Sequence, residues 1–339
     1  MSLEINNLTV ELFADKQNDK RINVADSLFL NVDEGEVVSI VGESGSGKSF
    51  LGLSILRLNP PRISNIASGE IKIKCKSQDK EIDILKLKPD ELVGVRGRLI
   101  SMVFQDPNTS LNPVMKIGEQ ITEAVLAHKK VSKKSAKDTA IKYLNSMNID
   151  GESRFGSYPY ELSGGMRQRV MIAMAMVLEP CFLIADEPTT ALDVTTSLQV
   201  LKLIKDIKEK SNIGVIFITH DLTIARSISD RTYVFYAGQV MESGSTEDII
   251  NNPAHPYTVS LIKSVPSLSA DYIPKQRLFA IPGFLTKDDF SKGKCRFYSR
   301  CFKRGDECLI DIPLSSFKGG GKSARDVRCV KVKKIAINK

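Results

Sequence analysis

The sequence GESGSGKS, residues Gly42–Ser49, follows an apolar run at Val37–Val41 and precedes a helical pattern that places Leu51, Ile55 and Leu58 on one face. A glycine-rich turn between a buried strand and a helix is the context in which the motif G-x-x-x-x-G-K-[ST] binds phosphate. The glycines allow backbone N–H groups to surround the phosphates, and the helix N-terminus adds roughly half a positive charge toward them. We therefore predict a nucleotide-binding phosphate loop formed by Gly42, Glu43, Ser44, Gly45, Ser46, Gly47, Lys48 and Ser49.

Residues for catalysis and Mg²⁺ binding are predicted in the phosphate loop and in a second segment of the chain. The Lys48 ammonium should neutralise charge on the β- and γ-phosphates of ATP, and the Ser49 hydroxyl should bind Mg²⁺. A second apolar run, Phe182–Ala185, ends in Asp186 and Glu187. Two adjacent carboxylates are by themselves more often a solvated surface pair, but a position directly after a buried strand favours a functional site. We predict that Asp186 holds Mg²⁺ through water and that Glu187 polarises the attacking water.

Two other apolar segments end in polar residues suited to the same nucleotide. Gln105 follows the strand-like Ser101–Phe104, and its amide can contact both Mg²⁺ and water. His220 follows Val215–Thr219 and is one of 3 histidines in the chain. A lone histidine is more often structural, yet a position at a strand end favours contact with the γ-phosphate. The predicted catalytic residues are thus Glu187 and His220, and the predicted Mg²⁺ ligands are Ser49, Gln105 and Asp186.

The composition is that of a folded protein of about two domains. Of the 339 residues 42% are hydrophobic and 26% are charged, which excludes an intrinsically disordered chain. No secretory signal is visible, and the longest apolar stretch, Val170–Leu178, is about half of what a membrane-spanning helix needs. The net charge of +8 suits nucleic acid or an anionic membrane surface, but the absence of tryptophan disfavours stacking on single-stranded nucleic acid. We expect a soluble, cytosolic protein.

Hydrophobic periodicity predicts an α/β fold. Three apolar runs indicate buried strands of a parallel sheet; one precedes the phosphate loop, one precedes Asp186 and one precedes His220. In contrast, apolar and polar residues alternate in Leu3–Phe13 and Gly69–Cys75, as they do in antiparallel strands. A hairpin is expected at Tyr233–Gly244. Helical spacing without strand signals predicts a helical subdomain at about residues 110–165.

The character of the sequence changes from Pro266 onward, which indicates a domain boundary near Asn252–Ser267. Prolines, glycines, scattered charges and four cysteines replace long periodic segments there. We therefore divide the chain into a nucleotide-binding domain at residues 1–260, with the helical subdomain inserted, and a small irregular C-terminal domain at residues 261–339.

A further motif, LSGGMRQR at Leu162–Arg169, restricts the possible protein families, because few phosphate-loop proteins combine it with an acidic run such as LIADEPTTALD. With Gln105 and the ITHD segment around His220, these motifs resemble the ATP-binding subunits of ABC transporters over essentially Leu3–Leu261. The resemblance implies a P-loop ABC ATPase core with an antiparallel β subdomain and an inserted helical subdomain. It also implies a head-to-tail dimer that holds two ATP molecules between its subunits.

In such a dimer, the resemblance places three signature residues against the γ-phosphate held by the opposite subunit: Ser163, Gly164 and Gly165. A serine that caps a helix and directs its N-terminus at an anion suits this contact. The loop that carries Asp193 would lie at the dimer seam. Phe13 is the nearest candidate for stacking on adenine, with Leu12 as the alternative.

Other segments resemble one branch of that family. FQDPNTSLNP at Phe104–Pro113, HPYT at His255–Thr258 and the length beyond it are similar to the ATPases of oligopeptide and dipeptide importers, a group that includes nickel and glutathione importers. In that group a C-terminal extension carries four cysteines, which are here Cys295, Cys301, Cys308 and Cys329. Some members hold an iron–sulfur cluster there.

The ligand of these four cysteines is not fixed by their spacing. Four thiolates in one short segment can bind a [4Fe–4S] cluster or a tetrahedral Zn²⁺, but the spacing matches neither zinc-ribbon pairs nor ferredoxins. The [4Fe–4S] cluster is therefore predicted from the resemblance, with zinc and four unliganded thiols as alternatives. Nearby basic residues would offset the charge of a cluster: Arg296, Arg300, Lys303 and Arg304. Cys75 and Cys181 are expected to be buried structural residues, and a reducing compartment argues against disulfides.

The resemblance implies the ATP-hydrolysing subunit of an ABC importer that takes up peptides across the cytoplasmic membrane. The expected partners are a homologous ATPase subunit in a heterodimer, two transmembrane permease subunits and an extracellular substrate-binding protein, with no nucleic acid. The chain would lie peripherally on the cytoplasmic face of the membrane. The alternatives are an importer of nickel or glutathione and, from another class, a soluble ABC ATPase that acts on nucleic acid.

Overall fold

The computed structural model describes residues 1–15, 20–76, 80–265, 279–317 and 325–332. The chain folds into two compact units. The first unit contains Met1–Leu3, Asn31–Val37 and Lys72–Phe217, and the second contains Glu4–Leu30, Val38–Ile71 and the chain from Ile218 onward. The phosphate loop therefore belongs to the second unit, and the predicted catalytic carboxylate Glu187 belongs to the first.

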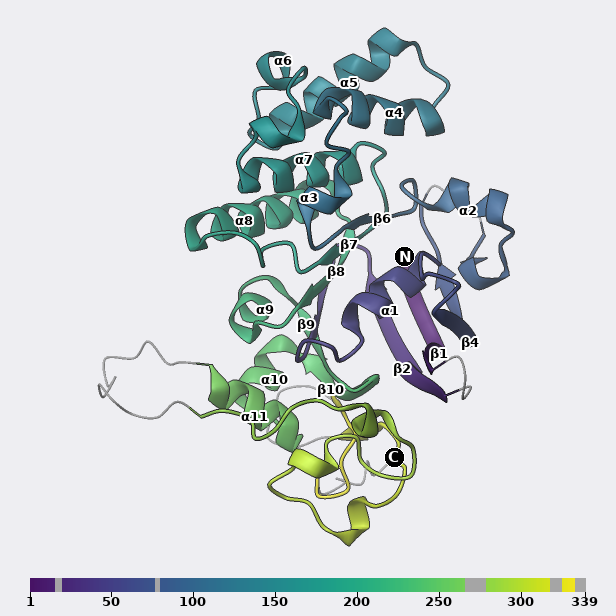
Figure 1. Ribbon diagram of the computed structural model, residues 1–339, viewed down its shortest axis with the longest axis vertical. Coiled ribbons are helices and arrows are strands. Elements are labelled where there is room, and N and C mark those ends of the chain that lie inside the picture. Colours follow the sequence, from purple (N-terminus) through teal and green to yellow (C-terminus); the bar gives the residue numbers. More distant parts are fainter. Residues whose placement is uncertain (16–19, 77–79, 266–278, 318–324, 333–339) are drawn as a thin grey trace, which may run out of the picture. The chain divides into compact units, whose positions relative to one another are not determined.

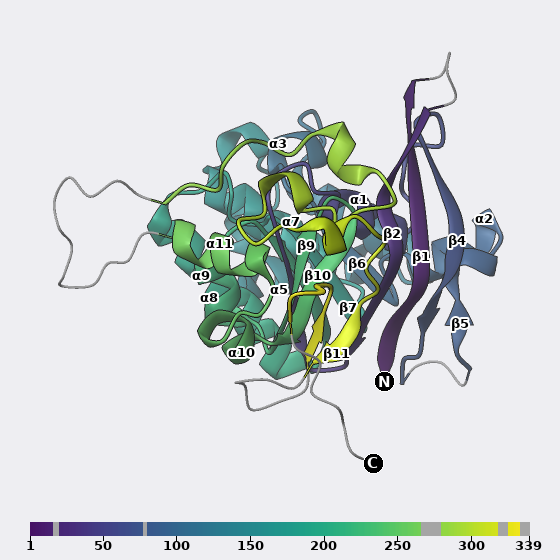
Figure 2. The same ribbon diagram turned by 90° about the horizontal axis from the view of Figure 1, so that it is seen from below.

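The second unit contains an antiparallel layer of long strands. β1 (Ser2–Asp15), β2 (Lys20–Asp33) and β4 (Ser64–Ile73) run side by side in the order β2-β1-β4 (Figure 2). In β1 the side chains of Ile5, Leu8 and Val10 are buried, and the change of parity between them coincides with Asn7, whose φ is 50°. A left-handed residue inside a strand shifts its alternation by one position. The predicted strand is confirmed, with this irregularity inside it.

The predicted hairpin belongs to a second group of paired strands in this unit. Its order is β11-β12-β10-β9-β3, in which β3 (Val37–Val41) runs parallel to β9 (Arg231–Tyr236) from Val38 onward. β9 and β10 (Gln239–Ser245) are antiparallel. They turn at Ala237 and Gly238, whose φ angles of 45° and 83° are those of a primed hairpin turn. β12 (Arg325–Val327) and β11 (Ser315–Phe317) add C-terminal residues to this sheet.

The helix after the phosphate loop is shorter than the sequence pattern indicates. α1 spans Lys48–Ile55, so it ends before Leu58, which is 36% exposed. Arg57 adopts a φ of 51°, and the N–H of Leu58 donates to the carbonyl of Leu53. This is a Schellman ending, in which one left-handed residue satisfies the last carbonyls of the helix. Among its described residues, the unit also forms the helices α9 (Leu222–Ile228), α10 (Thr246–Asn251) and α11 (Pro256–Ser264) and the short 3-10 turns η3 (Lys287–Phe290), η4 (Tyr298–Arg300) and η5 (Asp306–Cys308).

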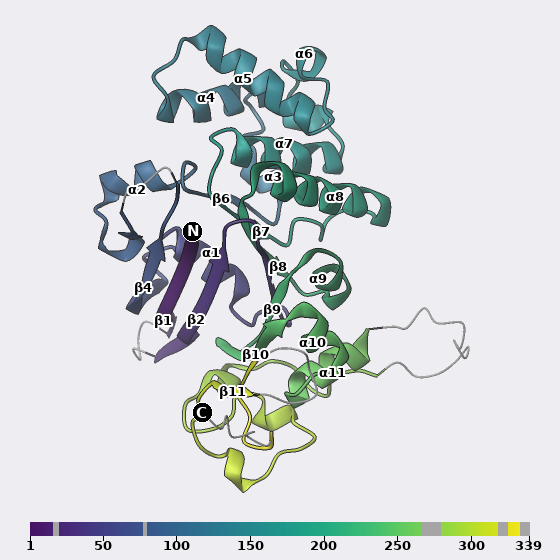
Figure 3. The same cartoon turned by 180° about the vertical axis from the view of Figure 1, so that it is seen from behind.

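The C-terminal segment packs within the second unit. Figure 3 shows it beside α11 and β10, and its residues Cys295, Phe297 and Cys308 share one buried cluster with Tyr236 and Tyr257. The boundary predicted at residues 260–261 stays a prediction, because the chain between residues 266 and 278 lies outside the described residues.

The first unit contains the predicted helical subdomain (Figure 1). α4 (Ile117–His128) buries Ile117, Ile121 and Val125, and α5 (Lys133–Ser146) buries Ile141 and Leu144, so the helical spacing in the sequence is confirmed. Both helices contact α7 (Gly164–Met176). The described residues of this unit also form α2 (Pro89–Val95), α3 (Pro107–Ser110), α6 (Gly151–Arg154), α8 (Val194–Ser211), η1 (Ile84–Lys86) and η2 (Pro159–Glu161).

The first unit also contains three buried strands, which neighbour one another in the order in which they follow along the chain. β6 (Ile100–Val103) pairs in parallel with β7 (Phe182–Asp186), and β8 (Gly214–Thr219) neighbours β7. Every residue of β6, β7 and β8 is buried, as continuous apolar runs predict for a sheet covered on both faces. A short strand, β5 (Ile82–Asp83), pairs with the end of β4. No helix in the described part of the chain has the length and apolar character to cross a membrane.

One prediction about the cysteines is wrong. Cys75 and Cys181 are joined as a disulfide, although a reducing compartment argued against any. Both lie in the first unit, and their Cα atoms are 6.1 Å apart, inside the range of about 4.4–6.8 Å that a disulfide spans. The compartment argument concerns redox potential, whereas the fold brings together two residues 106 positions apart in sequence.

Candidate functional site

The phosphate loop is shaped by glycines that tolerate no side chain. Gly45 and Gly47 have φ angles of 80° and 106°, which L residues rarely adopt. A Cβ on Gly42 would lie 2.0 Å from the carbonyl oxygen of Phe235, and one on Gly47 would lie 2.2 Å from that of Val24. The loop therefore sits directly against two neighbouring backbones, which fixes its course before it enters α1.

Lys48 closes the loop from inside. Its side chain is buried, and its Nζ donates to the carbonyl oxygens of Gly42 and Glu43, each at 2.8 Å. The lysine therefore points across the turn toward its start, where a phosphate-binding lysine is expected to be. Ser49, the predicted Mg²⁺ ligand, is the second residue of α1.

Two carboxylates of the first unit, the predicted Mg²⁺ ligand Asp186 and the predicted catalytic residue Glu187, are buried at the end of β7. Asp186 is 4% exposed and Glu187 is 8% exposed. Glu187 has a φ of 43°, a left-handed conformation that costs a non-glycine residue about 1–3 kcal/mol. Such strain persists only where the surrounding structure enforces it, and it is concentrated at functional sites.

Two side chains hold the Glu187 carboxylate in place. Thr190 Oγ1 donates to Glu187 Oε2 at 2.8 Å, and Gln105 Nε2 donates to the same oxygen at 3.3 Å. The structure thus brings together Gln105 and Glu187, which the sequence predicted separately. Thr190 was missed; its place three residues after Glu187, in the run ADEPTTALD, was the available signal.

The signature segment caps a helix as predicted. Ser163 is the N-cap of α7, and its Oγ accepts the N–H of Met166 at 3.3 Å. Gly165 is buried where α7 approaches α8, since a Cβ there would lie 2.2 Å from Cγ2 of Thr196. Gly164 has room for a Cβ, whose nearest neighbour would be Leu192 at 3.6 Å.

Asp193 caps the next helix. Its Oδ1 accepts the N–H of Thr196 at 2.9 Å, and its Oδ2 accepts the Thr196 hydroxyl at 2.7 Å. These hydrogen bonds hold the pKa of the Asp193 carboxyl below its ordinary value. Val194 and Leu198, on the same helix, are 79% and 62% exposed, so this end of α8 presents apolar surface to solvent.

His220 and Phe13 lie in the second unit. His220 follows β8, is exposed, and borders a pocket of about 480 Å³ with Asp221 and the end of α11. Phe13 lies near the end of β1, where the guanidinium of Arg21 is 5.6 Å from the centre of its ring. Neither observation tests the predicted contact with γ-phosphate or adenine.

The predicted Mg²⁺ ligands differ in chemistry from the four C-terminal cysteines. Ser49, Gln105 and Asp186 offer hydroxyl, amide and carboxylate oxygens, which are the hard ligands that Mg²⁺ prefers. Within the described residues, no three His, Cys, Asp or Glu side chains form a group that could hold a metal ion.

The four C-terminal cysteines therefore do not support the predicted iron–sulfur cluster. Cys295 and Cys308 are buried, and Cys301 and Cys329 are partly buried. Burial raises the pKa of the Cys295 thiol to about 12, and the three other thiols add to this.

Two of the arginines assigned to cluster charge have other partners. Arg296 is buried and forms an ion pair with Asp26, and Arg300 forms one with Glu43 of the phosphate loop. The prediction that they offset a cluster is corrected, because each guanidinium is engaged by a carboxylate from the N-terminal part of the chain.

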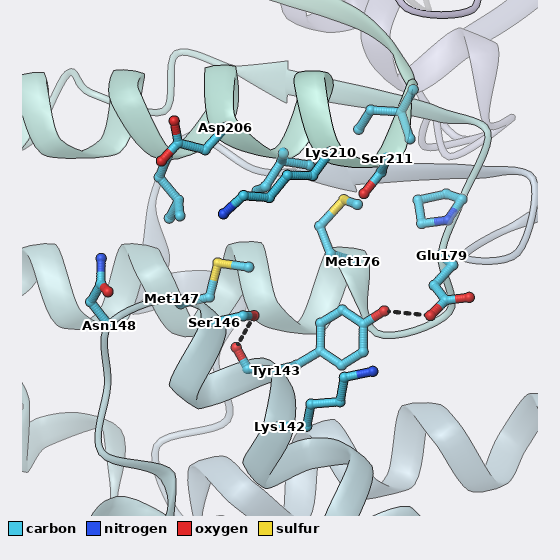
Figure 4. Close-up of a pocket in the computed structure, with 14 residues that line it drawn as sticks. Lys142, Tyr143, Ser146, Met147, Asn148, Met176, Glu179, Asp206, Lys210 and Ser211 are labelled. Carbon is cyan, nitrogen blue, oxygen red and sulfur yellow. Dashed lines mark hydrogen bonds between the residues drawn. The ribbon is translucent and has the colours of Figure 1, made fainter.

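A pocket of about 650 Å³ lies between α5, α7 and α8 of the first unit (Figure 4). Tyr143 and Glu179 point toward one another there, and the Tyr143 hydroxyl donates to Glu179 Oε1 at 2.9 Å. Lys142, Asp206 and Lys210 also line the pocket. None of the predicted nucleotide-site residues lines this pocket, so its size alone does not make it the site.

Comparison with protein families gives two matches along the chain. The model of the ABC transporter family matches residues 25–190, which include the phosphate loop, Gln105, the signature and Glu187. The model described as oligopeptide/dipeptide transporter, C-terminal region, matches residues 241–308, which include His255 and three of the four C-terminal cysteines.

Individual relatives extend this match to nearly the whole chain. The oligopeptide transport ATP-binding protein AppD of Bacillus subtilis is 43% identical over 96% of this chain and 95% of its own length. The probable D,D-dipeptide transport ATP-binding protein DdpD of Escherichia coli is 41% identical over 85% of each chain. Among solved structures, the dimeric ATP-binding cassette MJ0796 bound to ADP and Pi superimposes with a TM-score of 0.62 and 30% identity, covering 72% of this chain and 98% of that one.

A strained, hydrogen-bonded glutamate at a strand end, a glycine-built phosphate loop and a helix-capping signature are thus found in a chain that matches such relatives over most of its length. The chain belongs to the ABC transporter family as an ATP-binding, ATP-hydrolysing subunit of its oligopeptide/dipeptide transporter branch.

Proposed function

We propose that this chain couples ATP binding and hydrolysis to the uptake of peptides through a membrane-embedded permease. The observation that carries the hydrolytic part is the Glu187 carboxylate, buried, strained and held by Gln105 and Thr190 at the end of β7. The peptide cargo is supported by the names of the relatives, which transport oligopeptides and dipeptides.

The ATP phosphates would be bound by the phosphate loop. The backbone N–H groups at the start of α1 and the Lys48 ammonium supply positive charge toward the β- and γ-phosphates. Mg²⁺ bound to these phosphates would neutralise charge that develops during hydrolysis, with Ser49, Gln105 and Asp186 as its ligands or water partners. Positioning and charge stabilisation are most of what phosphoryl transfer requires from a protein.

Glu187 would orient and polarise the attacking water. Thr190 and Gln105 both donate to Oε2, which fixes the position of that oxygen. His220 would act as the second catalytic residue by contacting the γ-phosphate, as its position after β8 suggests. Both roles are proposals that a substitution can test.

Hydrolysis would require a second subunit. Ser163, Gly164 and Gly165 stand at the N-terminus of α7, and Ser163 is exposed, so this helix end is accessible to a γ-phosphate bound by a partner. Val194 and Leu198, which are exposed apolar residues near Asp193, would be buried by a partner subunit at such a dimer interface. The MJ0796 cassette, which resembles this chain, is dimeric. We place the assembly, with a homologous ATPase subunit, two permease subunits and an extracellular binding protein, at the cytoplasmic face of the membrane.

The substitution Glu187→Gln tests the proposed reaction. It keeps the size and one hydrogen-bonding oxygen of the side chain but removes the negative charge that polarises water, so ATP turnover should fall by about 100-fold or more. ATP affinity should stay close to that of the wild type. Steady-state phosphate release and binding of a fluorescent ATP analogue measure the two quantities.

Glu179→Gln is the matched control, because Glu179 also has a left-handed φ, 56°, but belongs to the pocket near Tyr143. Its turnover should be unchanged. Normal turnover in Glu187→Gln would remove this carboxylate from the reaction.

The alternatives differ in their cargo or partner. An importer of nickel or glutathione would show uptake of those compounds, and not of peptides, when the chain is reconstituted with its permease in vesicles. A soluble ATPase acting on nucleic acid would be retained on RNA or DNA in a salt-dependent manner and would not co-purify with a permease.

The [4Fe–4S] cluster at Cys295, Cys301, Cys308 and Cys329 stays a prediction that rests on the resemblance. Iron and zinc analysis of anaerobically purified protein, with its visible absorbance, decides between cluster, zinc and free thiols.

A further inference from the structure

The phosphate loop is contacted by residues 214 and 257 positions further along the chain. The backbone N–H of Glu43 donates to the hydroxyl of Tyr257 at 3.0 Å. The Glu43 carboxylate accepts two bonds from Arg300, at 2.7 Å from Nη1 to Oε2 and 3.1 Å from Nη2 to Oε1. One residue of the loop is therefore held through both its main chain and its side chain.

The start of α11 sets the position of Tyr257. His255 is the N-cap, and its Nδ1 accepts the N–H of Tyr257 at 3.0 Å. The Glu242 carboxylate accepts the N–H groups of Ala254 and His255 at 2.9 and 2.8 Å. Burial lowers the pKa of His255 to about 3, so its imidazole is neutral and can accept this bond. The motif His-Pro-Tyr thus forms a rigid helix start that aims one hydroxyl at the loop.

Arg300 is fixed independently of Glu43. Its Nε donates to the carbonyl oxygen of Pro282 at 2.7 Å, and its Nη1 donates to the Tyr236 hydroxyl at 3.3 Å. Its side chain is 6% exposed. Burial lowers the pKa of Arg300, but its hydrogen bonds to Glu43 and Tyr236 outweigh this, and the pKa stands above its ordinary value. The guanidinium therefore stays charged where it meets the loop.

Aromatic packing joins the two contacts. The ring of Phe297 lies 5.3 Å from that of Tyr236 and 5.1 Å from that of Tyr257, centre to centre. Both tyrosines are fully buried in the same cluster as Phe297. A displacement of the C-terminal segment would shift both tyrosine rings, since these buried rings are closely packed against Phe297.

The charge of Glu43 explains why the loop needs this partner. A carboxylate inside a loop that binds a polyanion repels the phosphates unless a cation offsets it. A bidentate guanidinium both neutralises the carboxylate and fixes its plane, which a lysine does not do.

We propose that Tyr257 and Arg300 are positioning residues of the ATP site, which hold the phosphate loop at Glu43 and neutralise its carboxylate. The C-terminal region is then part of the nucleotide-binding machinery. This inference rests on the proposed function, because it concerns the binding of ATP by the same loop.

Equilibrium binding of fluorescent ATP and ADP analogues to the full-length chain tests the proposal. Arg300→Gln should weaken ATP binding by about tenfold or more, because Glu43 is left uncompensated beside the phosphates. The loss should be larger for ATP than for ADP, since the repulsion grows with phosphate charge. The double variant Arg300→Gln with Glu43→Gln should recover to within about threefold of the wild type, because the unpaired charge is gone.

Tyr257→Phe probes the main-chain contact separately. It keeps the buried ring and removes only the hydroxyl, so ATP affinity should fall by about twofold to tenfold. Arg304→Gln is the matched control, because this arginine lies in the same segment and donates to the Ser299 carbonyl. It should bind ATP as the wild type does.

Lys48→Ala separates this proposal from the function itself. If the wild type binds no nucleotide, or Lys48→Ala binds as the wild type does, the proposed function fails. If the wild type binds and Lys48→Ala does not, three results overturn the positioning role alone. These are ATP affinity of Arg300→Gln within twofold of the wild type, equal losses for ATP and ADP, or no recovery in the double variant. Should Arg300→Gln fail to fold, Tyr257→Phe and Arg300→Lys give the same decision, with Arg300→Lys expected to retain part of the affinity.

Discussion

The phosphate loop and the signature segment are both glycine-rich turns that begin a helix, yet they are held in different ways. The phosphate loop lies against the backbones of Val24 and Phe235, and its Glu43 is bonded by Tyr257 and Arg300. Ser163 of the signature is exposed, and its side chain caps its own helix through Met166. The first turn is preorganised by distant parts of its own unit, whereas the second offers a helix end to solvent. This difference suits a loop that binds its own ATP and a segment that contacts the ATP of a partner.

The largest expected effect concerns the close approach of Gly165, in the signature, to Thr196. In Gly165→Ala the new methyl would meet Thr196 Cγ2 at 2.2 Å. Thr196 cannot rotate freely, because its hydroxyl and its N–H are both bonded to Asp193. We expect the free energy of unfolding to fall by about 1–3 kcal/mol, even though alanine favours helices over glycine. Urea unfolding of the full chain measures it.

A second substitution sharpens this test. Thr196→Ser removes Cγ2 but keeps the hydroxyl that bonds Asp193, so it should restore most of the stability lost in Gly165→Ala. Gly164→Ala serves as the control, because its methyl would meet only Leu192 at an ordinary 3.6 Å. Equal losses at the two glycines would mean that the close approach of α7 to α8 is not what requires Gly165.

The next effect concerns the helix start that supports the phosphate loop, and it depends on pH. Burial lowers the pKa of His255 from 6.5 to about 3, so below pH 6.5 the unfolded chain takes up a proton that the folded chain does not. Stability contributed at neutral pH is therefore lost as the pH falls. From pH 7.5 to 5.5 this residue should lower the free energy of unfolding by about 1.4 kcal/mol.

His255→Asn isolates this contribution. Asparagine can still cap α11 by accepting the N–H of Tyr257, but it does not titrate. The difference between the two proteins cancels the opposite influence of Glu242, whose pKa burial raises. Thermal unfolding at several pH values measures both slopes; parallel curves would show that His255 is protonated as readily in the folded chain.

The smallest stability effect is expected at the exposed signature serine. Ser163→Ala removes the cap of α7, which should lower the free energy of unfolding by about 1 kcal/mol. ATP turnover by the assembled ATPase dimer should fall more than the stability does, because the serine contacts the partner's ATP. ATP affinity of the single chain should not change.

Ser132→Ala is the matched control for that experiment. Ser132 caps α5 through the N–H of Ser135 at 3.2 Å, so it should lose a similar amount of stability with no loss of turnover. If both variants turn over ATP equally, the signature serine has only its structural role, and the contrast with the phosphate loop disappears.

Local patterns in the sequence predicted much of the architecture. The runs that became β3, β7 and β8 were continuous apolar segments, and the Ala237-Gly238 turn closed the expected hairpin. The helical spacing of α4 and α5 was equally readable. The error in the length of α1 also has a local cause. Arg57 adopts the left-handed conformation that ends the helix, whereas the usual sequence signal for such an ending is a glycine.

Contacts between distant segments were not predicted. The hydrogen bond from Gln105 to Glu187, the disulfide between Cys75 and Cys181, and the ion pair of Arg300 with Glu43 all depend on how strands and loops meet. The arginines near the C-terminal cysteines were assigned to a cluster because they are close to it in sequence, which proved a poor guide to their partners.

Short-range patterns were enough to predict the phosphate loop, the capped signature helix and Glu187 at a strand end, because glycine geometry, helix capping and strand burial act over a few neighbouring residues. The contacts of Glu43 with Tyr257 and Arg300 became visible only in the folded chain. A hydrogen bond and an ion pair leave no local pattern when 214 and 257 positions separate the partners, and the packing of Phe297 against both tyrosines brings them to the loop.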